Sequence, residues 1–236
     1  MGSEKQIDEK RQLYEKHVRH REDICPEILH TILKDLPRTY PQCPWVEHHI
    51  SDIQPLLVSY AAVHKGDSYL QGFNYHMINT YRVFHGTQHA LADTWWCFSR
   101  IVGLVRPLMP DFNLNWFSWC KSHWYNELLK RIRKTRPHMY SVLAAHEDRF
   151  STLLTCKWFM IWFAQNVDWD ELPELYDICI QTHPRDLIQL YISVVFQVME
   201  KVAPTISYEC SADTCDIVHK ILNIRIKNIG TLVHLT

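Results

Sequence analysis

Glycine is scarce in this chain, with only 6 in 236 residues. Two-residue β-hairpins depend on glycine or asparagine at positive φ, so an architecture of many tight hairpins is disfavoured. Apolar residues instead recur at spacings of three and four across long segments, which is typical of amphipathic helices. The sequence therefore predicts an all-α fold, arranged as one large domain or two packed lobes.

An excess of charge of one sign is also missing. The 25 Lys and Arg residues nearly balance the 26 Asp and Glu residues, so no overall field attracts nucleic acid or an anionic membrane. Long apolar runs are missing as well, because the uncharged segment 187–199 is shorter than the roughly 18–20 residues of a membrane-spanning helix. We expect no nucleic-acid partner and no transmembrane segment.

Sequence patterns of several other kinds of site do not occur. There is no GxxxxGK[ST] phosphate-binding loop, so we expect the chain to hold no nucleotide or other cofactor of its own. The 8 cysteines form no CxxC pair, and the charged N-terminus lacks the apolar core of a secretory signal. We therefore expect free thiols and a cytoplasmic location. Cys210, Cys215 and His219 offer three zinc-ligand side chains within ten residues, but without HExxH or a paired CxxC we expect no metal site and interpret the histidines as core or surface residues.

The segment ILKDLPR, residues 32–38, places a carboxylate and a guanidinium three residues apart across a predicted helix end. The helix is expected to begin near Pro26 and to end at Asp35 or Leu36, because Pro37 interrupts the hydrogen-bond ladder. An anion at a helix C-terminus opposes the macrodipole by about 0.3–1 kcal/mol, so we expect Asp35 to orient Arg38. An exposed, weak charge pair is the alternative.

The segment YLQGFN, residues 69–74, places a glycine between two amides. The apolar spacing predicts a helix from Tyr69, capped by Asp67 or Ser68, with Gln71 in its exposed first turn and Asn74 on the polar face. Gly72 inside a helix would cost about 0.5–1 kcal/mol, which suggests that a partner approaches the backbone closely there. A solvated face with a glycine used for helix packing is the alternative.

Together the two segments resemble the TBC domain, the family of Rab GTPase-activating proteins. The residues that carry the resemblance are Ile32, Asp35 and Arg38 in the pattern IxxDxxR, and Tyr69, Gln71, Gly72 and Asn74 in the pattern YxQGxN. DTWWCF at 93–98 and the Trp-rich segment 157–177 are similar to later helices of the family, so the resemblance spans roughly residues 24–200. The Gly-(Ile/Val)-Pro step that usually opens the family's domain has no clear counterpart before Pro26.

The resemblance implies a two-lobed, multi-helix domain, which we place at residues 24–236. Residues 1–23 are densely charged, with Ile7, Leu13 and Val18 as their only aliphatic side chains, and are expected to form an exposed helical extension. The resemblance further implies that Arg38 acts as an arginine finger and Gln71 as a glutamine finger, supplied in trans to a Rab-family GTPase in its GTP form. Asp35, Tyr69, Gly72 and Asn74 would support the two fingers. Mg²⁺ and GTP would belong to the partner, and the protein would act in vesicle trafficking, associating with endomembranes peripherally through the GTPase.

Two other functions stay open at this point. One is a catalytically silent TBC-like module that binds GTPases or scaffolds membrane-traffic complexes, and the other is a helical interaction domain without a GTPase partner. The basic segment 130–138 is interpreted as a solvated helix end, with contact to acidic lipid or an acidic partner as the alternative. His48, His49 and Asp52 could form an acid–base group, although no nucleophile accompanies them. Further helices are expected at 50–64, 89–105, 115–134, 151–166, 170–181, 186–202 and 213–226.

Overall fold

The computed structural model describes residues 4–64, 69–105, 124–202, 220–221 and 223–227. The chain divides into two compact units, Met1–Leu104 and Val105–Thr236. Within the described residues, regular structure is helical apart from an isolated parallel bridge between Val167 and Ile226. The predicted all-α, two-lobed fold is therefore confirmed.

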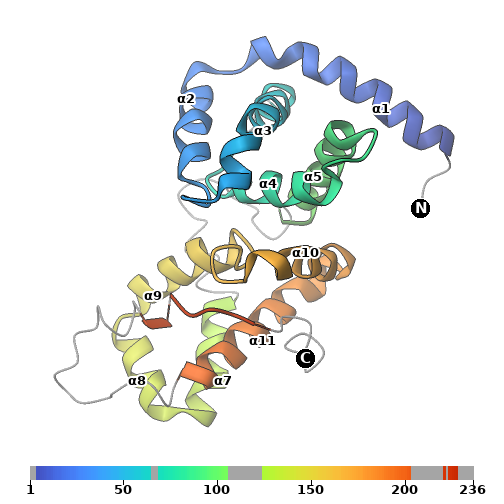
Figure 1. The fold of residues 1–236 in the computed structure, drawn as a ribbon. Helices are drawn as coiled ribbons and strands as arrows, with labels where there is room; N and C mark the ends of the chain where they lie inside the picture. The colour runs from blue at the N-terminus through green and yellow to red at the C-terminus, as the bar shows by residue number, and fades with distance from the viewer. Residues whose placement is uncertain (1–3, 65–68, 106–123, 203–219, 222, 228–236) are drawn as a thin grey trace. The chain divides into compact units, whose positions relative to one another are not determined.

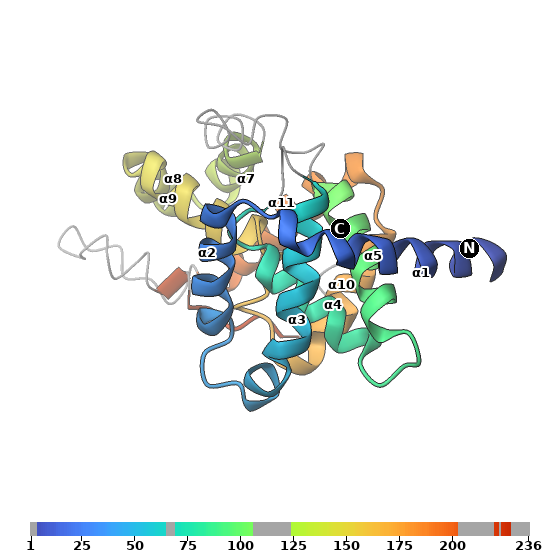
Figure 2. The same cartoon turned by 90° about the horizontal axis from the view of Figure 1, so that it is seen from above.

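The first unit is built around its longest helix. Its α-helices are α1 (Glu4–Arg19), α2 (Pro26–Asp35), α3 (Pro44–Val63), α4 (Phe73–Phe84) and α5 (Ala90–Val105). Helix α3 contacts α1, α2 and α4, and it lies between α2 and α5 in Figures 1 and 2. The fully buried side chains include Leu56 and Leu57 of α3, Met77 of α4, and Trp95 and Phe98 of α5.

Proline sets several helix boundaries in this unit. Helix α2 has Pro26 in its first turn and ends at Asp35, as predicted, and a 3-10 turn over Leu36–Arg38 follows it. Helix α3 begins at Pro44, six residues earlier than predicted, and continues through Pro55. A proline is tolerated in a first turn, whereas inside a helix it removes one hydrogen bond. Nine buried residues of α3 supply the packing that offsets this loss.

Helix α1 lies against the other helices of the first unit. The guanidinium of Arg11 pairs with the carboxylate of Asp93 at 3.1 Å, and the Trp96 indole donates a 2.8 Å hydrogen bond to the Lys10 carbonyl. The His17 ring stacks on Trp95 with 5.0 Å between the ring centroids. No residue of α1 is fully buried. Whether residues 1–23 form an extension separate from a domain at 24–236 stays a prediction.

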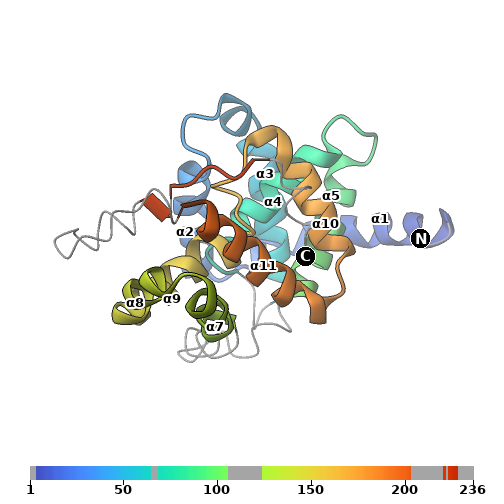
Figure 3. The same cartoon turned by 90° about the horizontal axis from the view of Figure 1, so that it is seen from below.

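The second unit contains α7 (Asn126–Thr135), α8 (Pro137–Ala145), α9 (Glu147–Leu154), α10 (Leu172–Gln181) and α11 (Pro184–Val202). Helix α7 contacts α8 and α11 (Figure 3). The phenol ring of Tyr191 on α11 contacts Trp124, Phe159 and Phe163, with ring centroids 4.8–5.2 Å apart. These aromatic contacts form much of the core of this unit.

Two predicted helices of the second unit are wrong in part. The helix predicted at 151–166 ends at Leu154, and after a π-helical turn at Thr155–Phe159 the chain adopts positive φ at Trp162 and Phe163. Both side chains are buried, so packing offsets the cost of that backbone. Of the helix predicted at 213–226, residues 213–219 lie outside the described residues, and Ile226 pairs with Val167 instead.

Candidate functional site

Arg38 lies at the end of the 3-10 turn that follows α2. Leu36 is 1% exposed and anchors this turn in the core, whereas the Arg38 side chain is exposed. Among the described residues, the guanidinium forms no ion pair and no hydrogen bond. The predicted pairing of Asp35 with Arg38 is therefore not formed. Asp35 instead accepts a 2.9 Å hydrogen bond from the Tyr69 hydroxyl, because the packing of α2 brings the two side chains together.

Gly72 does not lie inside a helix. Its φ of 110° and ψ of −25° place it in the left-handed region as the N-cap of α4, whose first residue is Phe73. The predicted helix start at Tyr69 is therefore wrong, and the predicted caps Asp67 and Ser68 lie outside the described residues. An L side chain in the left-handed region costs roughly 1–2 kcal/mol, which explains why glycine occupies this position.

Gln71 is exposed in the turn that precedes α4. The prediction that it lies in the first turn of the helix is wrong, because α4 begins two residues later, at Phe73. Its side-chain amide, like the guanidinium of Arg38, forms no hydrogen bond or ion pair with the described residues. Both side chains are therefore available to a partner without breaking an existing interaction.

Asn74 is buried rather than solvated, with 4% of its surface exposed. Its Oδ1 accepts a 2.9 Å hydrogen bond from the Gly72 backbone N–H, and its Nδ2 donates to Thr39 Oγ1. The Thr39 hydroxyl in turn donates to the Asp35 carbonyl at 2.8 Å. Thr39 was missed in the sequence, because a threonine next to Arg38 gives no periodic signal and its partner lies 35 residues away.

Two hydrogen-bonded bridges thus join the two motifs. The first bridge joins Asp35 to Tyr69, which lie before Arg38 and Gln71 in their segments. The second joins Thr39 to Asn74, which lie after them. Burial raises the pKa of Tyr69 well above its usual range, and the neighbouring Asp35 carboxylate raises this pKa further. The Tyr69 hydroxyl therefore stays protonated and donates to Asp35. Segments 35–39 and 69–74 are held side by side, each carrying one exposed, unpaired polar side chain.

The family follows from a comparison with known sequences. A sequence model described as the Rab-GTPase-TBC domain matches residues 2–203. The chain belongs to the Rab-GTPase-TBC domain family. It is similar in fold to the crystal structure of the Ypt/Rab-GAP domain of Gyp1p, with a TM-score of 0.75 and 14% sequence identity over 97% of this chain and 78% of that one. No curated protein sequence matches it.

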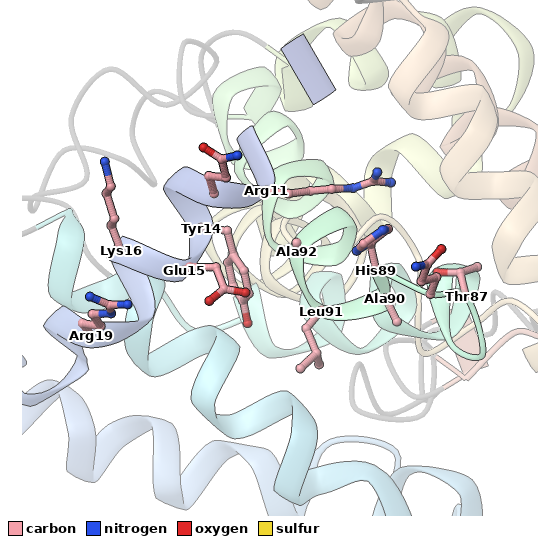
Figure 4. A pocket seen from close by; sticks show the side chains of 12 residues that line it. Arg11, Tyr14, Glu15, Lys16, Arg19, Thr87, His89, Ala90, Leu91 and Ala92 are labelled. Atoms are coloured by element: carbon pink, nitrogen blue, oxygen red, sulfur yellow. The ribbon is translucent and has the colours of Figure 1, made fainter. Parts of the chain in front are cut away.

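In this TBC domain, the surface formed by segments 35–39 and 69–74 does not coincide with the hollow drawn in Figure 4. That hollow has a volume of about 700 Å³ and is bounded by α1 on one side and residues 87–92 on the other. None of the motif residues lines it. One of its cations, Arg11, is already paired with Asp93 and Asp8. We therefore assign the hollow no part in the site formed by segments 35–39 and 69–74.

The remaining candidates from the sequence have structural roles or lie outside the described residues. The Asp52 carboxylate accepts a hydrogen bond from Tyr81, and the His49 ring stacks on Trp45. Most cations of segment 130–138 have partners on helices of the same unit: Lys130 with Glu127, Arg131 with Ser193 and Gln189, Arg133 with Tyr140, and Arg136 with Glu200. These contacts favour the interpretation of the segment as a helix end.

The described part of the chain contains neither a candidate metal site nor a candidate membrane-spanning helix. No group of three or more His, Cys, Asp and Glu side chains there is arranged to hold a metal ion. Cys210, Cys215 and His219 lie outside that part. None of the helices found there combines the length and the apolar character that crossing a membrane requires.

Proposed function

We propose that this TBC domain is a GTPase-activating protein that supplies Arg38 and Gln71 in trans to a Rab-family GTPase in its GTP form. The observation that carries the proposal is the pair of bridges, Tyr69 to Asp35 and Asn74 to Thr39, which hold the two exposed side chains on neighbouring segments. The membership of the chain in the Rab-GTPase-TBC domain family supports the choice of partner.

The chemistry of Arg38 suits phosphoryl transfer. Hydrolysis of GTP spreads negative charge over the oxygens of the transferring γ-phosphoryl group, and a guanidinium supplied by an activator accelerates this step by about 10³–10⁵-fold. Arg38 has no carboxylate partner among the described residues, so it does not have to leave an ion pair in order to reach a phosphate. We therefore assign the arginine finger to Arg38.

The chemistry of Gln71 suits the positioning of water. A glutamine amide carries both an acceptor and two donors, so it can accept from the attacking water and donate to the phosphate at the same time. Such a contact aligns the water for in-line attack and lowers the entropic part of the barrier. The nucleotide and Mg²⁺ would come with the GTPase. We further propose that the protein works in the cytoplasm in vesicle trafficking and reaches endomembranes through that GTPase.

The proposal is tested by single-turnover GTP hydrolysis across a panel of GTP-loaded Rabs, with and without this protein. The wild type should accelerate hydrolysis by at least one member, Arg38→Ala should lose at least about 100-fold of that acceleration, and Gln71→Ala should lose at least about 10-fold. Arg21→Ala and Gln12→Ala are matched controls, because both side chains are exposed on other elements of the same unit. They should keep the wild-type rate.

Three outcomes would contradict parts of this assignment. Absence of acceleration for every Rab would exclude the activating function. Binding to a GTP-loaded Rab without acceleration would instead support the catalytically silent module. An active wild type whose Arg38→Ala variant keeps the full rate would reject Arg38 as the finger while leaving the activating function in place.

A further inference from the structure

The segment directly after Arg38 adopts a backbone that its residues rarely take. Tyr40 has a φ of 51° and Gln42 a φ of 68°, although neither is a glycine. A bulky aromatic residue in the left-handed region is strained, and Pro41 restricts the conformation of the residue before it still further. Such strain persists only where the surroundings hold the chain in place, and it concentrates at functional sites.

Contacts with α4 hold this strained segment. The Tyr40 hydroxyl donates to Asn79 Oδ1 at 3.0 Å and lies 2.8 Å from Asn79 Nδ2, which donates to it. Asn79 is buried, with 3% of its surface exposed. The Tyr40 ring also packs edge-on against Tyr75, with 5.0 Å between the centroids. The hydroxyl and the ring of Tyr40 therefore have separate partners on one helix.

Helix α4 also positions the two segments that carry Arg38 and Gln71, residues 35–39 and 69–74. Thr39 binds Asn74 in the first turn of α4, while Tyr40 binds Asn79 more than one turn further along. The Gln71 turn leads directly into the N-terminus of α4 through Gly72. Helix α4 thus supports both the Arg38 segment and the Gln71 turn. Of the contacts named here, the one between Tyr40 and Asn79 lies furthest along α4 from the Gln71 turn.

We propose that Tyr40, held by Asn79, is a positioning residue that keeps residues 38–42 in the conformation from which Arg38 reaches the nucleotide of the partner. This inference rests on the function proposed above. Tyr40 does not touch the reacting groups in this scheme. It acts by ordering the Arg38 segment before the partner binds, which removes an entropic cost from the catalytic step.

Tyr40→Phe is the sharpest perturbation, because it removes the hydroxyl and keeps the ring against Tyr75. The matched control is Tyr81→Phe, which removes a tyrosine hydroxyl from α4 itself, where it donates to Asp52 at 2.9 Å away from the motif bridges. We expect Tyr40→Phe to lower kcat by about 10-fold or more, with KM for the Rab changed less than about threefold. Tyr81→Phe should keep kcat near the wild-type value.

A second arm asks whether Tyr40 acts through Arg38. In an Arg38→Ala background, Tyr40→Phe should cause less than about a twofold further loss, because residues that act as a unit are not additive. A loss of equal size in both backgrounds, an unchanged kcat in folded Tyr40→Phe, or an equal loss in Tyr81→Phe would overturn the inference.

Limited trypsin digestion supplies a readout that does not depend on GTPase activation. Loosening of the segment should speed cleavage after Arg38 several-fold in Tyr40→Phe and leave it unchanged in Tyr81→Phe, as measured by mass spectrometry. Unchanged cleavage in Tyr40→Phe would overturn the holding role of Tyr40. An inactive wild type with faster cleavage in Tyr40→Phe would instead reject the proposed function and keep Tyr40 as the residue that holds the segment.

Discussion

Gly72→Ala tests whether the backbone of the Gln71 turn positions the glutamine. Gly72 has a φ of 110°, and its N–H donates to the buried Asn74 Oδ1 at 2.9 Å while its carbonyl accepts from Tyr75 N at 3.1 Å. Alanine must either keep this φ, at a cost of about 1–3 kcal/mol, or change it and lose hydrogen bonds that contribute about 0.5–1.5 kcal/mol each. By either route the free energy of unfolding should fall by about 1–3 kcal/mol.

Gly86→Ala is the matched control for this variant. Gly86 also has a positive φ, of 84°, and a Cβ added to it would meet no atom within 4 Å. Urea denaturation should show both variants destabilised, since each places an L side chain at positive φ. Single-turnover GTP hydrolysis should separate them, because displacement of a catalytic group by about 1 Å can cost roughly 100-fold in rate. We expect at least a 10-fold loss in Gly72→Ala and none in Gly86→Ala.

Each possible departure from these results refutes a different step of the reasoning. If Gly72→Ala is as stable as the wild type, the turn does not hold a left-handed residue at position 72. If it is destabilised but fully active, the backbone of the turn does not set the position of Gln71. An equal loss of activity in Gly86→Ala would show that destabilisation alone lowers the rate.

Two further predictions concern half-buried titratable groups in the first unit. Tyr69→Phe removes the hydrogen bond to Asp35, and because bonds to charged groups contribute about 1.5–3 kcal/mol, urea denaturation should show a loss of that order. The pKa of Tyr69 is raised in the folded state, so the unfolded chain loses this proton more readily, and the stability of the wild type should fall as the pH rises above about 10. The stability of Tyr69→Phe should fall less over the same pH range. Parallel pH profiles of the two proteins would contradict this. The pKa of His17 is lowered, mainly by burial and then by His64 and His20, so the unfolded chain takes up this proton more readily. The free energy of unfolding should therefore decrease as the pH falls below about 6.5. Between pH 7.5 and pH 5.5, the melting temperature of His17→Gln should fall less than that of the wild type. Equal falls would contradict the lowered pKa of His17.

The helices were predictable where short-range physics decides them. The end of α2 at Asp35 follows from Pro37, which has no backbone N–H to continue the hydrogen-bond ladder, although Leu36 itself keeps an α conformation with a φ of −55° and a ψ of −49°. Helix α5 was predicted to within one residue of its start, because its apolar spacing is regular. The second unit was predicted less well where the core overrides local preference. Trp162 and Phe163 take positive φ because their side chains are buried there, and helical spacing does not reveal such a reversal.

The YLQGFN segment shows how a regular pattern can mislead. Tyr69, Phe73 and Met77 recur every four residues, so the spacing predicts a helix that already includes Tyr69. The helix begins only at Phe73, because Gly72 takes a φ that no helix contains and its N–H is satisfied by Asn74. The spacing is real, but Tyr69 serves a different partner, the carboxylate of Asp35.

The sequence by itself determined the family resemblance, the helical class and the identity of the two polar residues, Arg38 and Gln71, because these depend on residue type and order along the chain. The tertiary structure decided which groups meet. Asp35 binds Tyr69 rather than Arg38, and Asn74 binds a threonine that no local pattern marks. These partners lie 34 and 35 residues apart in the chain. Their contact depends on how α2, α3 and α4 pack, because only the tertiary fold brings residues at that separation within hydrogen-bond distance.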